Sequence, residues 1–228
     1  MDILVKEFPS LLQGALLVIK IAAGHLALGF VLGLILASME VYGGKIISLL
    51  GRTIQKVIRG IPALVLLMLM YFSLSRLTDV STTFVAIVAL GIRSAAYQSQ
   101  VFRGGIKAIE SGQMEAALSI GMRKLRAIRR IILPQALRLV IGPWSNIYTM
   151  EVKDVSLAYS IGVLEILRRA RFIIRYTHGN ALLLYTVIAL FYFILTRLGN
   201  TLLYRLEAKL WIPGFERREK IRWSRRKE

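Results

Sequence analysis

The sequence predicts an all-α polytopic membrane protein with five transmembrane helices, for three reasons. Hydrophobic residues make up 56% of the 228 residues, whereas a soluble domain has about 45–50%. The excess gathers in continuous blocks close to the ~20 residues that an α-helix needs to cross about 30 Å of hydrocarbon. Barrel strands would instead alternate apolar and polar residues over short runs. Helices are therefore the structure that satisfies the backbone amides of these blocks in lipid.

Five apolar blocks follow one another along the chain, separated by charged segments. The predicted spans are 11–39, 61–74, 81–101, 131–150 and 182–204. The second is short, and Gly60 and Pro62 mark its start because proline suits the first turn of a helix. In the first span Gly29, Gly33 and Ala37 recur at every fourth position, which predicts close packing against another helix.

The chain begins with a segment, 1–10, that carries both acids and bases. The apolar stretch after it is too long for the core of a cleaved signal peptide, so we expect the first span to remain in the mature protein. A transmembrane domain is predicted over 11–213, and a basic cytoplasmic tail over 214–228.

Basic residues are distributed unequally between the two sides of the predicted membrane domain. The chain has 31 Lys and Arg against 13 Asp and Glu, a net charge of +18, and most of the basic residues fall in 39–60, in 102–130 and after position 204. The positive-inside rule places these three regions in the cytoplasm. The N-terminus is then outside and the C-terminus inside. We attribute the charge to cytoplasmic loops and anionic lipid headgroups, and expect no nucleic acid partner.

Several classes of site are excluded or disfavoured by what the sequence lacks. There is no cysteine, which excludes disulfides and thiolate metal sites, and His25 and His178 stand far apart. No GxxxxGK[ST], HExxH or GxSxG motif occurs. We therefore expect this chain to have no catalytic residues, to bind no metal and to hold no cofactor.

The most informative segment runs from Glu115 to Gly121 as Glu-Ala-Ala-Leu-Ser-Ile-Gly, and Ile-Ile-Leu-Pro follows at 131–134 after nine residues. It predicts a short cytoplasmic helix with Glu115 in its first turn, where an acid complements the helix dipole. Gly121 is expected to end this helix in the left-handed conformation.

The surface of this short helix has an unusual composition. Ala116 and Ala117 leave a low surface that another protein can approach, while Leu118 and Ile120 are apolar in a loop rich in arginine. The pattern fits a docking element. It fits an ordinary surface helix between two spans about equally well, because most such helices carry no function of their own.

The spacing of this segment resembles the EAA loop of ABC importer permeases at every marker position. Three further segments resemble the polar amino acid branch of that family, the histidine-permease type. They are Arg-Gly-Ile-Pro at 59–62, Ala-Tyr-Gln-Ser-Gln-Val-Phe-Arg-Gly-Gly-Ile at 96–106, and Lys-Asp-Val-Ser-Leu at 153–157 with Ile-Gly-Val at 161–163. The sequence departs from the branch pattern at Ile61, Gln100 and Val155, and the missing acid at Gln100 leaves the charge class of the substrate open.

The resemblance covers about 8–213 and implies a type I permease fold in the plasma or inner membrane. It implies coupling through the loop at about 103–130, with the contact made by Glu115, Ala116, Ala117, Leu118 and Gly121. It also implies several partners: an ATPase dimer that holds ATP and Mg²⁺, a second permease subunit, a solute-binding protein and an amino acid substrate, in contact with membrane lipid.

Charged side chains within spans usually face protein or a water-filled path, because they are costly in lipid. Arg93, Tyr97 and Gln100 share one face of a helix, and that face is suited to a substrate carboxylate. Glu151 and Asp154 are candidates for binding an ammonium group. Alternatively, Arg93 pairs with another helix or reaches an interface, and Asp154 caps the segment that follows it.

Other charged segments have less specific interpretations. Lys20, His25, Arg138 and Arg197 are expected to pack or to anchor the chain at the interface. Segment 163–175 has apolar residues at helical spacing and predicts a short external helix, which meets either the solute-binding protein or lipid headgroups.

Two other functions compete with that of an importer subunit. A small ATP-independent carrier or ion channel needs charged rings or an internal repeat, and no clear repeat is present. An intramembrane enzyme needs a nucleophile with its base, or a metal site, and neither pattern occurs. A five-span chain is also too small to enclose a path alone, so we expect a dimer of such subunits.

Overall fold

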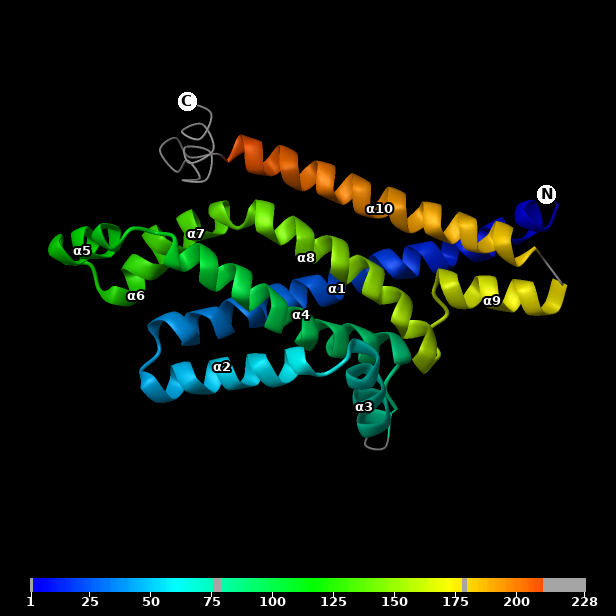
Figure 1. Ribbon diagram of the computed structural model, residues 1–228, viewed down its shortest axis with the longest axis horizontal. Coiled ribbons are helices and arrows are strands. Elements are labelled where there is room, and N and C mark those ends of the chain that lie inside the picture. Colours follow the sequence, from blue (N-terminus) through cyan, green and yellow to red (C-terminus); the bar gives the residue numbers. More distant parts are fainter. Residues whose placement is uncertain (1, 76–78, 178–179, 211–228) are drawn as a thin grey trace, which may run out of the picture.

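The computed structural model describes residues 2–75, 79–177 and 180–210, and Figure 1 shows them as a bundle of helices. The helices are α1 (Asp2–Tyr42), α2 (Lys45–Gly60), α3 (Ala63–Ser75), α4 (Thr82–Lys107), α5 (Ser111–Ser119), α6 (Lys124–Ala127), η1 (Ile128–Ile132), α7 (Leu133–Leu139), α8 (Ile141–Asp154), η2 (Val155–Ile161), α9 (Ile166–Thr177) and α10 (Ala181–Lys209). No strand occurs among the described residues, and the predicted all-helical class is confirmed. The basic tail at 214–228, like His178, lies outside them.

The central pair of the bundle is α1 and α4, which lie side by side over most of their lengths. The predicted small-residue stripe of α1 forms this contact. A Cβ atom on Gly29 would lie 2.7 Å from the Ser94 hydroxyl, and one on Gly33 would lie 3.0 Å from the Ala95 carbonyl oxygen. Ala37 continues the same line and is fully buried. The stripe therefore packs helix against helix, as predicted.

Among the residues that the structure describes, two helices are long and apolar enough to cross a membrane, namely 6–42 of α1 and the whole of α10. A third crossing is possible if α2 and α3, which meet at a bend of 101°, count as one broken span. The predicted third span is helical as α4, but polar residues from Arg93 onward lower its hydropathy. The predicted fourth span is not one helix, because it is divided at Val140 into α7 and α8. The number of five spans stays a prediction.

The region 39–60, expected to be a loop, is largely a helix. The helix α2 covers all but the first residues of this region and is amphipathic. It buries a polar face against α4, where the Gln55 amide donates to the Ala96 carbonyl at 3.3 Å. Ile46 and Leu49 are exposed on the other side. An amphipathic helix of this kind contains no continuous apolar run. The search for apolar blocks in the sequence therefore did not predict α2.

The outer surface of the bundle is apolar where α10 runs along it. Leu182, Phe193 and Leu202 are all exposed. Exposed apolar side chains in such number along one helix are unusual for a soluble monomer and suit contact with lipid. The exposed apolar surface of α10 therefore agrees with the membrane location predicted from the composition.

The two ends of the bundle are built differently (Figure 1). Helices α5 and α6 lie at one end, together with the C-terminal end of α10, while α9 lies at the opposite end beside the N-terminus. The predicted cytoplasmic loop and the predicted external helix are thus separated by the length of the bundle.

Candidate functional site

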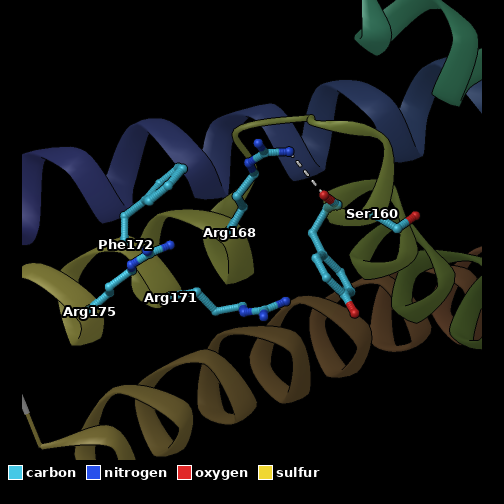
Figure 2. A pocket seen from close by; sticks show the side chains of 6 residues that line it. Ser160, Arg168, Arg171, Phe172 and Arg175 are labelled. Atoms are coloured by element: carbon cyan, nitrogen blue, oxygen red, sulfur yellow. Dashed lines mark hydrogen bonds between the residues drawn. The ribbon is translucent and has the colours of Figure 1, made fainter.

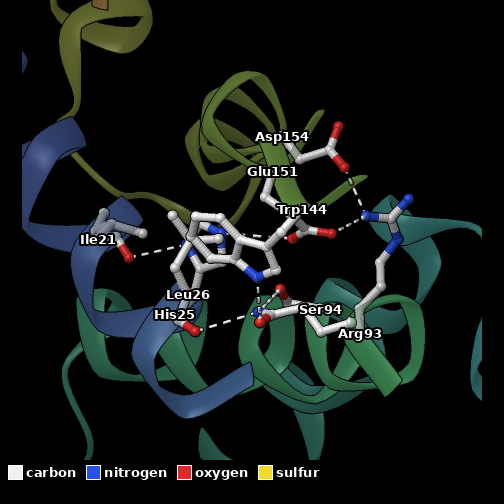
Figure 3. Close-up of polar contacts among 9 residues, drawn as sticks. Ile21, His25, Leu26, Arg93, Ser94, Trp144, Glu151 and Asp154 are labelled. Carbon is white, nitrogen blue, oxygen red and sulfur yellow. Dashed lines mark hydrogen bonds and ion pairs between the residues drawn. The ribbon is translucent and has the colours of Figure 1, made fainter. Parts of the chain in front are cut away.

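A cluster of charged side chains is buried where α4 meets α8 (Figure 3). The Arg93 guanidinium donates to Asp154 at 2.6 Å and lies 3.5 Å from Glu151. Glu151 is fully buried, Arg93 nearly so, and Asp154 is partly exposed. Arg93 does pair with another helix, as one of its two interpretations expected. Binding of a substrate carboxylate by Arg93 stays a prediction. The alternative for Asp154 is wrong, since its side chain makes no capping hydrogen bond to η2.

Of the two other predicted pathway residues on α4, Tyr97 contacts the charged cluster and Gln100 does not. The Tyr97 ring lies beneath the guanidinium of Arg93, 4.8 Å from the ring centroid, and also beneath that of Arg59 at 5.2 Å. Such cation–π contacts hold the arginine over the ring. Gln100 does not join the cluster, because its side-chain carbonyl accepts a hydrogen bond from Arg103 at 2.8 Å.

His25 of α1 completes the cluster from the other side, although the sequence predicted only packing or anchoring for it. The ring is fully buried, with Nδ1 2.9 Å from the Ile21 carbonyl oxygen and Nε2 3.4 Å from Glu151 Oε2 (Figure 3). A histidine inside one predicted span and an acid at the end of another were the signals available. Nothing in the sequence indicated that they meet.

A layer of uncharged polar groups lies beside the charged cluster and was not predicted. The fully buried Gln98 amide donates to the Leu26 carbonyl and to the Ser94 hydroxyl, and it accepts from the Trp144 indole at 2.8 Å. Each of these bonds joins α4 to itself, to α1 or to α8. A fully satisfied network of this kind fixes the positions of the helices that carry the charges.

The predicted coupling helix is present as α5, but its start differs from the prediction. It begins at Ser111, so Glu115 is in its second turn and not in the first. The end of the helix agrees with the prediction. Gly121 has φ of +80°, its amide donates to the Leu118 carbonyl, and the Met122 amide donates to the Ala117 carbonyl. These two bonds form a Schellman motif, for which glycine is the favoured residue.

The side chains of α5 divide into a buried one and several exposed ones. Ala117 is 2% exposed, so it holds α5 against the rest of the chain and does not present a surface to a partner. Glu115 and Ala116 are exposed. Ile120, directly after the helix, is 77% exposed. The accessible surface of this helix is therefore narrower than the sequence suggested.

A basic pocket of about 430 Å³ lies at the other end of the bundle, against α9 (Figure 2). Arg168, Arg171 and Arg175 line it. Arg168 donates to the Tyr159 carbonyl at 3.1 Å, and the Arg171 guanidinium lies over the Tyr159 ring. Three arginines around one hollow attract anionic groups.

Comparison with known proteins identifies the family. Residues 29–212 match the model of the binding-protein-dependent transport system inner membrane component family. The chain belongs to this family. It is thus an inner-membrane permease component of an ABC importer, and the ATPase is a separate subunit. This assignment decides against the carrier, channel and enzyme alternatives.

Individual relatives agree with the family over nearly the whole chain. The glutamine transport system permease protein GlnP of Escherichia coli strain K12 is 35% identical over 209 residues, which cover 90% of this chain and 94% of the relative. The probable amino-acid permease protein YxeN of Bacillus subtilis is 32% identical over 201 residues, 86% of this chain and 88% of the relative.

Solved structures resemble the fold. A chain from an amino acid ABC transporter with histidines superimposes with a TM-score of 0.79 at 31% identity, over 90% of this chain and 96% of the other. A chain of the methionine transporter MetNI in an inward-facing conformation gives 0.77 at 21% identity, over 91% and 99%. This permease therefore has the fold of an amino acid ABC transporter permease, as its sequence motifs suggested.

Proposed function

We propose that this permease passes polar amino acids across the membrane and that Arg93, Glu151 and Asp154 contact them on the way. An α-amino acid carries a carboxylate and an ammonium group, and the cluster offers one cation and two anions. Arg93 binds the carboxylate through charge-assisted hydrogen bonds, and Asp154, which is partly exposed, accepts the ammonium group. The names of the relatives support the amino acid class, since one of them is a glutamine permease.

Substrate binding at this cluster requires a pair of side chains to separate. Arg93 and Asp154 form an ion pair at 2.6 Å. While they are paired, neither side chain is free to bind the opposite charge of a substrate. A zwitterionic substrate places its carboxylate against Arg93 and its ammonium group against Asp154. Both side chains then have a new partner, and no buried charge is left unpaired. Tyr97 lines the path beneath Arg93, and Gln100 lines it one turn further along α4.

The second part of the proposal concerns α5, which we assign to contact with the ATPase. Glu115 and Ala116 are exposed along it. Leu118 and Ile120 form an apolar tip, and Gly121 fixes the turn that follows. An apolar tip on a rigid short helix suits a groove in a partner protein. The ATPase holds ATP and Mg²⁺, and its nucleotide cycle moves α5.

The membrane orientation completes the proposal. We place the α5 end of the bundle in the cytoplasm and the α9 end outside, with five crossings, the N-terminus out and the C-terminus in. The charge asymmetry of the loops supports this orientation. The basic pocket at α9 is then available to an acidic face of the binding protein. A second permease subunit encloses the path, and the two subunits alternate between outward-open and inward-open states.

The function is tested with the permease co-purified with its ATPase in lipid nanodiscs. We expect hydrolysis to rise when a polar amino acid and its binding protein are both added, and to stay unchanged with either alone. If no amino acid stimulates hydrolysis with any candidate binding protein from the same genome, the proposed function is wrong.

The coupling role of α5 is tested by two substitutions at one residue. Gly121→Val places a β-branched side chain at φ of +80°, which costs more than 1–2 kcal/mol, the approximate cost of a left-handed residue with a Cβ. It should abolish stimulation while leaving basal hydrolysis intact. Gly121→Asn, which tolerates this conformation, should retain stimulation. Equal stimulation in both variants would contradict the assignment.

A further inference from the structure

The hydrogen bond between His25 and its own helix fixes one of the two ring protons. The Ile21 carbonyl oxygen lies 2.9 Å from Nδ1, and a carbonyl oxygen can only accept a hydrogen bond. Nδ1 must therefore carry a hydrogen. In the neutral ring the second nitrogen, Nε2, is then an acceptor with a lone pair.

That second nitrogen faces a carboxylate oxygen. Nε2 lies 3.4 Å from Glu151 Oε2, both side chains are fully buried, and neither atom has a hydrogen-bond partner among the described residues. With a neutral ring and an ionised carboxylate, two lone pairs would face each other away from water. Leaving both acceptors unsatisfied costs several kcal/mol, of the order of two buried unpaired polar groups.

We propose that His25 and Glu151 hold one additional proton between them and that it resides on His25 Nε2. Arg93 decides its position: the guanidinium lies 3.5 Å from the other oxygen of Glu151 and stabilises the ionised carboxylate. The charged groups facing His25 are Glu151 and, behind it, Arg93 and Asp154. With the proton in place the cluster has two positive and two negative charges and is electrically neutral.

Neutrality of the cluster sets the class of substrate, which makes this inference dependent on the proposed function. An amino acid with an uncharged side chain is a zwitterion, and its entry leaves the buried site neutral. A lysine-like or glutamate-like side chain adds a net charge inside the membrane, where it is costly. His25 is thus a positioning residue that acts through Glu151 and favours amino acids with uncharged polar side chains.

The proton is tested directly by NMR, since the chain has only two histidines. In full-length permease with His178→Gln, labelled with ¹⁵N-histidine and placed in lipid nanodiscs, His25 is the sole histidine signal. We expect both ring nitrogens to be protonated at pH 7.5. In Glu151→Gln we expect a neutral ring with hydrogen on Nδ1 alone. Glu40→Gln, which removes a buried acid that pairs with Arg103, is the control and should leave His25 doubly protonated. A neutral ring in the parent protein overturns the proposal.

The consequence for substrate choice is tested by binding to the permease–ATPase complex without binding protein. His25→Gln leaves the cluster with a net negative charge, so the affinity ratio of glutamine to arginine should fall about tenfold, equivalent to ~1.4 kcal/mol. The double variant His25→Gln/Glu151→Gln is neutral again and should restore the ratio. An unchanged ratio in His25→Gln overturns the specificity role. If His25→Gln fails to fold, the NMR comparison still decides.

These outcomes are distinct from those that bear on the proposed function. Loss of the shared proton with normal stimulation of the ATPase by amino acids removes only the role of His25. Absence of any amino acid stimulation in the unmodified complex removes the transport proposal itself.

Discussion

Arg93 is the residue on which the candidate substrate site depends most. It lies between Asp154 and Glu151 and over the Tyr97 ring, so its guanidinium contacts three other side chains. Removing one partner of a buried ion pair destabilises a protein more than replacing both partners with apolar residues. The reason is that the remaining charge is left buried without compensation.

Replacing Arg93 should therefore reduce both stability and transport. Arg93→Ala leaves Asp154 without its ion-pair partner and Glu151 with His25 alone. It should destabilise the permease by roughly 3–5 kcal/mol, with loss of amino acid-stimulated hydrolysis. Arg93→Lys keeps the charge but not the forked geometry and should retain part of both. Thermal unfolding of the purified complex, followed by tryptophan fluorescence, measures the first effect. Arg197→Ala, on the exposed face of α10, is the control and should change little. A fully stable, transporting Arg93→Ala would refute this role.

At the scale of helices, the contact between α1 and α4 depends on the absence of side-chain volume. Gly29→Ala places a Cβ 2.7 Å from Ser94 and Gln98, and should cost about 1–3 kcal/mol as overpacking. Gly104→Ala on the same α4 meets nothing within 4 Å and should be neutral or stabilising by up to ~1 kcal/mol. The difference in unfolding temperature between the two variants measures the effect. Equal unfolding temperatures for the two variants would show that the contact between α1 and α4 accepts the added methyl group without cost.

A second prediction at this scale concerns the start of α9. The buried Glu165 carboxylate accepts hydrogen bonds from the Leu167 and Arg168 amides. Burial raises the pKa of Glu165 from its ordinary value of 4.5 to about 7. Since the folded protein favours the protonated form, its stabilising effect is complete below about pH 4.5 and is lost as the pH rises through 7.

The expected change is at most on the order of 3 kcal/mol across this window. Glu165→Gln cannot titrate, so its unfolding temperature should fall less than that of the parent between pH 4.5 and pH 8. Glu110→Gln, at an exposed acid preceding α5, is the matched control and should follow the parent. Parallel curves for the parent and Glu165→Gln would show that this carboxyl does not titrate in the window.

At the scale of the whole molecule, the orientation in the membrane can be tested cleanly because the chain has no cysteine. Ile120 follows α5 and Tyr176 belongs to α9, and the two residues are comparably exposed, at 77% and 74%. Because α5 and α9 lie at opposite ends of the bundle (Figure 1), single cysteines at these two positions report on its two ends. In intact cells an impermeant maleimide should label the cysteine at Tyr176. The cysteine at Ile120 should react only after permeabilisation. The reverse pattern would invert the proposed topology.

The sequence determined the all-helical membrane class, the family and the turn at Gly121, because these depend on local composition and on the spacing of residues along one segment. It also placed Gly29 and Gly33 on a packing face. It did not reveal helix α2 or the break at Val140, since the first has an amphipathic pattern and the second lies within an apolar run.

Only the tertiary structure decided which charged residues meet. Arg93, His25 and Glu151 come from three helices that are far apart in sequence, and their pairing depends on how α1, α4 and α8 cross. The burial of Ala117 and the separation of Gln100 from the cluster were likewise set by packing. A one-dimensional pattern gives the face of a helix on which a side chain lies, whereas the partner across that face depends on the arrangement of the neighbouring helices.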